Sequence, residues 1–321
     1  MMKRTTKTWL TAAAVLACAG ILLFVLVMGV HHWDFSALST VRPTSDTVEI
    51  RESFSSISIA SDTESIAFLL AEGGGCSVRF IEFETVRHTA AVEDGTLVIE
   101  TIDEGRWYDH LMIAFYSPSI IVYLPQDTYA SLRIDQSTGD VLIPKNFTFE
   151  DVTISASTGD IEIDASVSGP VRVETDTGEI RIRDASVGAL DLSVSTGAVE
   201  VRSVECAGEL SISVGTGRAA LCGVSCRSLA SRGSTGDITL EDVTADETIS
   251  IERSTGDVRF VQCDAQELLV TTETGDVTGT LLSEKVFITK SKTGRVSVPE
   301  TTRGGACRIT TNTGDIRISL P

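Results

Sequence analysis

One class of side chain that can bind a cation recurs at a fixed place in this sequence. Ten Thr-Gly pairs follow one another at intervals of 19 or 20 residues, and the residue after the glycine is acidic in seven of them. The seven acidic positions are Asp140, Asp160, Glu179, Asp237, Asp257, Asp276 and Asp315. Carboxylates about 5 Å apart on stacked repeats repel by about 1 kcal/mol in water. Because Ca²⁺ takes several oxygen ligands, it could relieve that repulsion, so the column is a candidate calcium edge. One carboxylate per repeat is few for such a site, so the simpler interpretation is a turn-capping role.

Cysteines are the second group with chemical potential. Cys206 and Cys226 occupy equivalent positions in successive repeats and are expected to point inward as neighbours. Outside the cytoplasm, such a pair could form a disulfide. Otherwise the thiols fill the core as small hydrophobic groups, which is the interpretation we favour. Cys222 and Cys226 have a CxxxC spacing, but they lack histidine partners and the usual zinc spacing.

Aspartates are plentiful in the repeats, but histidines are missing from them. The four histidines are His31, His32, His88 and His110, and all precede the first Thr-Gly pair, so histidine-based acid–base or Ser-His catalysis is not expected there. No aspartate breaks the repeat pattern as an active site would. No Trp or Tyr follows residue 130 to stack a sugar ring. The sequence therefore predicts no catalytic or cofactor-binding residue and no enzyme, with a polysaccharide-active β-helix enzyme as the alternative.

Short β-strands are the elements that must position these residues. The residues two and four after each glycine are apolar in nearly every repeat, as in Val141 and Ile143. A second inward pair lies seven and five residues before the glycine. A weaker third pair lies seven and nine residues after the glycine. In the ninth repeat this pattern slips by one residue, so Val286 and Ile288 are expected to point inward. Alternation of β-branched residues with polar ones is typical of strands with one buried face.

Three inward pairs per repeat predict a coil with three short sides, stacked in parallel on its neighbours, each burying the inner face of the next. Rungs about 4.8 Å apart would make ten coils about 45–50 Å long. The repeated glycine supplies the positive φ of a sharp corner. The predicted fold is all-β: a parallel β-solenoid, or β-helix, of about ten coils of 19–20 residues, with an N-terminal β cap, preceded by one transmembrane helix.

The N-terminal segment is a candidate membrane anchor. Residues 9–30 carry no charge, and about 20 apolar residues suffice to cross a bilayer. Lys3, Arg4 and Lys7 precede them, which favours a cytoplasmic N-terminus and an extracytoplasmic remainder. Cleavage near Ala17-Cys18-Ala19, or lipidation of Cys18, would leave the apolar residues 20–30 at a new N-terminus, so an uncleaved single-pass helix is predicted.

The predicted organisation follows from these segments. Residues 1–8 form a basic cytoplasmic tip, 9–30 the helix, 31–47 a tether, 48–130 a β-rich cap or degenerate coils, and 131–321 the repeats. The net charge of −19 disfavours nucleic acid and anionic lipid headgroups as partners, apart from the basic N-terminus.

The chain also resembles a known family. The STGD and TGD repeats, the strand end Tyr123-Leu124-Pro125 and the stretch Asp94-Gly-Thr-Leu-Val-Ile99 resemble the bacterial "putative adhesin" family of β-strand-repeat proteins of unknown function. The resemblance covers roughly residues 50–320. It implies a β-solenoid at the cell envelope and supplies neither a ligand nor a catalytic residue.

These observations predict a membrane-anchored, extracytoplasmic structural or interaction module, adhesin-like and non-catalytic. Its partner would be an envelope protein or a glycan. A calcium-dependent adhesin that uses the acidic edge is the remaining alternative.

Overall fold

The computed structural model describes residues 4–30, 32–33, 44–82, 86–103 and 118–321. One helix, α1 (Arg4–Val30), precedes the strands. Its segment Ala13–Val30 has a mean hydropathy of 2.8, long and apolar enough to cross a membrane or to act as a signal sequence. Residues 1–3 of the predicted basic tip, most of the predicted tether, His31 and His110 lie outside the described residues.

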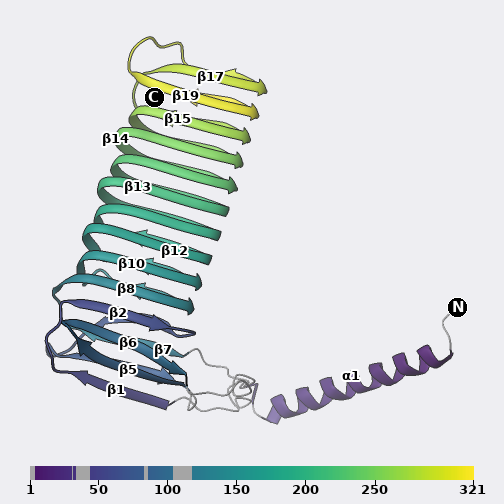
Figure 1. Ribbon diagram of the computed structural model, residues 1–321. Helices are drawn as coiled ribbons and strands as arrows, with labels where there is room; N and C mark the ends of the chain where they lie inside the picture. The colour runs from purple at the N-terminus through teal and green to yellow at the C-terminus, as the bar shows by residue number, and fades with distance from the viewer. Residues whose placement is uncertain (1–3, 31, 34–43, 83–85, 104–117) are drawn as a thin grey trace.

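The strands form one solenoid, as the period of the sequence predicted. The first repeats are β8 (Thr128–Thr138), β9 (Val141–Ile143), β10 (Thr148–Thr158) and β11 (Ile161–Ile163). They continue into β12 (Ser166–Arg183), β13 (Ser186–Thr235), β14 (Ile238–Thr255) and β15 (Val258–Thr274), which run around the corners without a break. Successive coils pair in parallel and in register, so that Thr177 lies beside Thr196 and Gly178 beside Gly197. Figure 1 shows these coils as a ladder of parallel rungs.

The core is a continuous column of aliphatic side chains inside the coils. The position seven residues before the repeat glycine is occupied by Val171, Leu190, Leu210, Leu229 and Ile249, each at most 1% exposed. Full burial of such a side chain contributes about 1.5–3 kcal/mol. Because each coil covers the next, this stabilisation depends on stacking rather than on any coil alone.

The glycine column fixes the sharpest corner. The repeat glycines have φ between +123° at Gly236 and +154° at Gly275 and Gly294. A Cβ added at Gly217 would lie 1.6 Å from the carbonyl oxygen of Gly197, and one added at Gly256 2.1 Å from that of Gly236. These positions therefore exclude every other residue on two independent grounds, backbone conformation and contact between coils.

The N-terminal segment continues the stack and then closes it. Its strands are β1 (Thr44–Ile50), β2 (Ser56–Ser61), β3 (Ser65–Leu70), β4 (Cys76–Glu82), β5 (Val86–Glu93), β6 (Thr96–Asp103) and β7 (Ser119–Leu124). β2 lies in parallel between β8 and β6, and β3 between β9 and β7. The antiparallel strands β4, β5 and β1 cover the end. β1 begins before the boundary at residue 48 expected for the cap; the division into domains stays a prediction.

The C-terminal coils are not stacked in sequence order. The strands are β16 (Val277–Leu281), β17 (Lys285–Thr293), β18 (Val296–Ser297), β19 (Gly305–Thr313) and β20 (Ile316–Ser319). β19 pairs with both β15 and β17, and β20 with both β16 and β18. The last repeat of the sequence therefore lies inside the stack, and the ninth repeat forms its outermost rung (Figure 1).

This arrangement corrects one expectation. Val286 and Ile288 were predicted to point inward, but they are 37% and 49% exposed. The register with β19 places Phe287 beside the buried Cys307 and Thr289 beside the buried Ile309. Because a shift of one residue turns a whole strand over, Val286 and Ile288 face outward.

Candidate interaction surfaces

The acidic column is a ladder of side-chain to backbone hydrogen bonds. Asp140 Oδ1 accepts the N–H of Asp160 at 2.8 Å, and Asp160 Oδ1 accepts the N–H of Glu179 at 2.9 Å. The second run repeats the pattern at 2.7–2.8 Å, from Asp237 to Asp257, Asp276, Asp315 and finally Arg295. Between the runs stand Ala198 and Arg218. The turn-capping interpretation thus has a specific geometry: six of the seven carboxylates accept the amide of the next coil, while Glu179 accepts a hydrogen bond from Arg181.

Arginines relieve the repulsion between these carboxylates. Arg181 lies 2.5 Å from Glu179 and 3.4 Å from Asp160. At the C-terminal end, Asp315 contacts both Arg317 and Arg295. The N–H of Arg295, followed by the two guanidinium groups, lowers the pKa of Asp315. The column is thus partly neutralised by protein groups.

Removing one hydrogen bond of the acidic column should cause a small but measurable loss of stability. We expect Asp257→Ala to lower the free energy of unfolding by about 0.5–1.5 kcal/mol, the net contribution of one hydrogen bond, and Asp257→Asn, which keeps an acceptor, to cost less. Ala198→Asp is the matched gain, because it places an acceptor below the amide of Arg218. Equal melting temperatures for all three variants in thermal unfolding of the full chain in detergent would contradict the ladder.

Calcium binding at this edge stays the untested alternative to turn capping. In the part of the chain that the structure describes, no three His, Cys, Asp or Glu side chains form a group that could hold a metal ion. One oxygen of each aspartate in the column already accepts an amide. We therefore expect the same melting temperature in calcium and in chelator at fixed ionic strength. A calcium-specific rise that Asp257→Ala abolishes would instead assign a cation site to the column.

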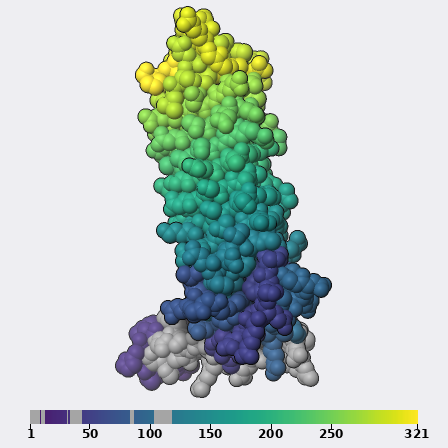
Figure 2. All heavy atoms as spheres, turned by 90° about the vertical axis from the view of Figure 1, so that its left-hand side faces the viewer, coloured from purple at the N-terminus to yellow at the C-terminus, as the bar shows by residue number. Residues whose placement is uncertain are grey.

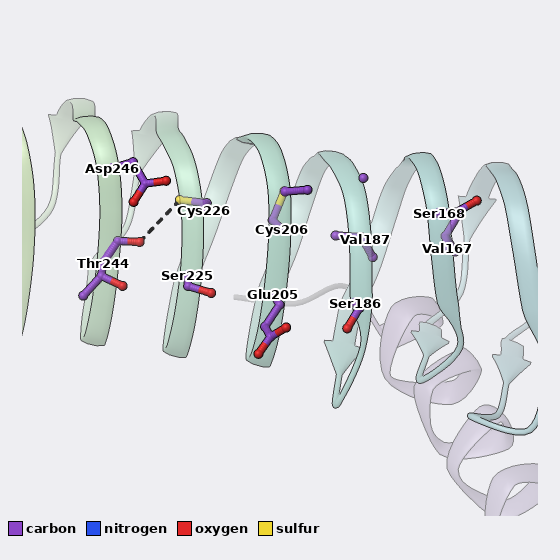
Figure 3. A pocket seen from close by; sticks show the side chains of 12 residues that line it. Val167, Ser168, Ser186, Val187, Glu205, Cys206, Ser225, Cys226, Thr244 and Asp246 are labelled. Atoms are coloured by element: carbon purple, nitrogen blue, oxygen red, sulfur yellow. Dashed lines mark hydrogen bonds between the residues drawn. The ribbon is translucent and has the colours of Figure 1, made fainter.

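Cys206 and Cys226 are among the residues that line a groove (Figure 3). The groove has a volume of about 550 Å³ and crosses several coils at another corner. Its wall includes Ser186, Glu205 and Asp246. Cys206 and Cys226 are buried free thiols, and Cys226 Sγ lies 3.9 Å from the carbonyl oxygen of Thr244. Burial raises the pKa of Cys206, and it raises that of Cys226 to about 12.

A thiol with so high a pKa is almost never ionised near neutral pH. We expect Cys206 and Cys226 to resist alkylation in the folded chain at pH 8 and to react fully in denaturant, because the thiolate is the reactive form. The half-buried Cys222 of the same coils is the internal comparison. Mass spectrometry of non-reduced peptides also tests the alternative raised by the sequence, a Cys206–Cys226 disulfide, which would appear as one cross-linked species and would contradict the expected reactivity.

A buried charged cluster in the N-terminal strands was not predicted from the sequence. The ring of His88, on β5, lies between Glu64 and Glu82. Its Nε2 is 3.2 Å from Glu64 Oε1 and its Nδ1 is 2.6 Å from Glu82 Oε2. The Phe80 ring stacks on the imidazole with centroids 5.0 Å apart. The side chains of His88 and Glu64 are each 1% exposed.

The charges of this cluster support one another. Burial opposes ionisation of Glu64, but His88 and the amides of Thr63 and Asp62 outweigh it and lower its pKa. Burial likewise opposes protonation of His88, but Glu64 and Glu82 outweigh it and raise its pKa. Glu64 also sits at the corner beneath Gly139. The cluster thus joins the closing strands to the first full coil and has a structural role.

The described residues form a β-solenoid with a filled apolar core and an acidic edge whose aspartates accept amides of neighbouring coils. The chain belongs to the Toastrack DUF4097 family, which matches residues 54–220 and 208–321. This membership confirms the resemblance noted in the sequence.

Two solved structures are similar to the chain, and the first of them shares the fold. A "putative adhesin" from Parabacteroides distasonis superposes with a TM-score of 0.52 at 10% identity, over 87% of this chain and 98% of that one. A "putative lipid binding protein" from the same organism gives 0.48 at 15% identity, over 86% and 97%. No curated protein sequence matches the chain.

Proposed function

We propose that this protein is a membrane-anchored, extracytoplasmic interaction module of the cell envelope that binds a partner without catalysing a reaction. The observation that supports the proposal most directly is that one apolar helix precedes a long, regular solenoid in the same chain. Its repeated exterior offers surfaces for contact, and the regular spacing of 19–20 residues between the glycines from Gly139 to Gly314 has no local break of the kind an active site makes.

The uncleaved helix is the first part of the proposal. α1 continues through the alternative cleavage site at residues 17–19 as far as Val30. Ile21 and Leu26 are 64% and 67% exposed, as lipid-facing side chains would be. Cleavage there would leave these groups in water, each at a cost of about 1.5–3 kcal/mol relative to burial. The basic residues before the helix favour a cytoplasmic N-terminus.

The absence of catalysis is the second part. Each aspartate of the column accepts an amide of the next coil, and Glu179 accepts a hydrogen bond from Arg181. The buried cysteines have raised pKa values, which disfavours a nucleophilic thiolate. In the His88 cluster, the side chains of His88 and Glu64 are buried and paired with each other. Each group with chemical potential therefore has a structural partner, and this distribution favours binding over turnover.

Topology is the direct test. The full chain would be produced in bacterial cells with one epitope at the N-terminus and another after Pro321. We expect it to stay in the membrane after carbonate extraction, with the C-terminal epitope exposed on spheroplasts and the N-terminal epitope exposed only after permeabilisation. Release of a chain that begins near Gly20, or the opposite exposure of the two epitopes, would contradict the proposal.

A further inference from the structure

The outermost rung of the solenoid, here called the tip coil (residues 282–304), has an open strand edge. Within the described residues, its strands β17 and β18 pair on one side only, with β19 and β20. The opposite edge therefore presents unpaired N–H and C=O groups, which can template another strand. Figures 1 and 2 place the tip coil at one end of the rod. β1 lies at the other end, which is the end that the chain joins to α1.

The tip coil also exposes apolar side chains. Leu282, Val286, Ile288 and Val296 are 46%, 37%, 49% and 44% exposed. In residues 128–281, Leu142 is the one large apolar side chain in this class. The exposure follows from the register with β19, which turns the apolar alternation of β17 outward. Exposed apolar side chains gathered in one region of a surface are a feature of interaction sites.

Its charge is opposite to that of the whole chain. Residues 282–304 contain five basic and two acidic side chains, a net +3, against −19 for the whole sequence. Lys285 is buried beside Asp264 at 2.5 Å. Lys290, Lys292 and Arg295 are exposed. A basic, apolar edge at the end of an acidic rod fits an acidic partner and suppresses basic ones.

The chain itself shows that coil edges accept a strand that is not next in sequence. β19 comes after β17 along the chain, yet it occupies the place between β15 and β17. It pairs in parallel and in register with both. The edge of a coil is thus specific for strand geometry and not for chain order.

Extending the proposed function, on which this inference rests, we propose that the tip coil binds an extended acidic segment of a partner protein, which adds as a strand along β17. Backbone hydrogen bonds would supply the pairing, while Val286, Ile288 and the lysines select the side chains. Two tips from two copies would carry like charges. The other end of the stack is closed by antiparallel strands, so a second copy fits less well.

A peptide from the chain is a suitable probe. Residues 266–273, Gln-Glu-Leu-Leu-Val-Thr-Thr-Glu, form part of the strand that pairs with β19. Stacked on β17 in the same register, this peptide places Leu268 beside Phe287 and Glu273 beside Lys292. The control peptide carries Glu267→Lys and Glu273→Lys. Binding to the full chain in nanodiscs would be measured by fluorescence anisotropy, and amide exchange of residues 285–293 by mass spectrometry.

We expect the acidic peptide to bind and to slow exchange in β17, and Lys290→Glu/Lys292→Glu to weaken it about tenfold. The matched body variant Arg133→Glu/Lys145→Glu should stay within about twofold. Three results would overturn the inference: no difference between the peptides or between the variants, binding of phosphatidylglycerol vesicles in place of the peptide, and tip-dependent self-association. None of these bears on the topology of the chain, which tests the proposed function separately.

Discussion

Replacing Gly256 with alanine should destabilise the solenoid by about 3–5 kcal/mol. The φ of Gly256 is +144°, and an added Cβ would lie 2.1 Å from the carbonyl oxygen of Gly236. The backbone conformation alone costs about 1–3 kcal/mol for a residue with a side chain, and forcing the coils apart adds a cost of similar size. Because coils pair on both sides, neither neighbour can move without losing hydrogen bonds.

Gly75→Ala is the matched control. An added Cβ at Gly75 has nothing within 4 Å, and its φ is not positive, so the change should stay within about 0.5 kcal/mol. Both variants would be compared by chemical denaturation of the full chain in the same detergent. Similar denaturation midpoints for the two variants would mean that the glycine column does not stabilise the stacked coils.

Replacing His88 with leucine should cost about 3–5 kcal/mol, the usual penalty for removing one partner of a buried charged group. The substitution leaves Glu64 and Glu82 facing each other without the imidazole that lies between them. Adding Glu64→Gln to His88→Leu removes one of those charges. The double variant should therefore be more stable than the sum of the two single losses predicts.

The same cluster gives a pH dependence with a defined sign. Because the folded pKa of Glu64 lies below its ordinary 4.5, its stabilisation is present above that pH and lost as pH falls through the folded value. Because the folded pKa of His88 lies above its ordinary 6.5, its stabilisation is complete below that pH and lost as pH rises through the folded value. The difference in the free energy of unfolding between the original chain and His88→Leu should be largest between pH 4.5 and 6.5. A difference that grows steadily toward alkaline pH would contradict this assignment.

The repeats were predictable because their information is local and periodic. The alternation around Val141 and Ile143 recurs in each coil, and the glycine with positive φ marks each corner. The same spacing places the acidic residues in one column, from Asp140 to Asp315. The capping role followed from residue type, while the acceptor geometry between coils required the register.

The two ends were less predictable because their partners are set by distant pairing. Val286 and Ile288 alternate with Phe287, so either face of β17 could be buried, and only pairing with β19 decides. The last repeat of the sequence lies between two earlier coils, and no feature of the local sequence indicates this placement. Likewise, Glu64 and His88 are 24 positions apart in the chain, and the antiparallel turn of β5 brings them together.

Site-specific photo-cross-linking in living cells tests the central claim, that this rod acts by binding a partner outside the cytoplasm. A photoreactive residue would replace Ile288 at the tip, Ser213 on the flank, or Leu132 in the buried core as the control. The account predicts a discrete cross-linked protein from the tip position and none from the core. A product from the flank alone would keep the interaction role and remove the tip from it. Equal, non-specific products from all three positions, or none from either surface position, would contradict the account.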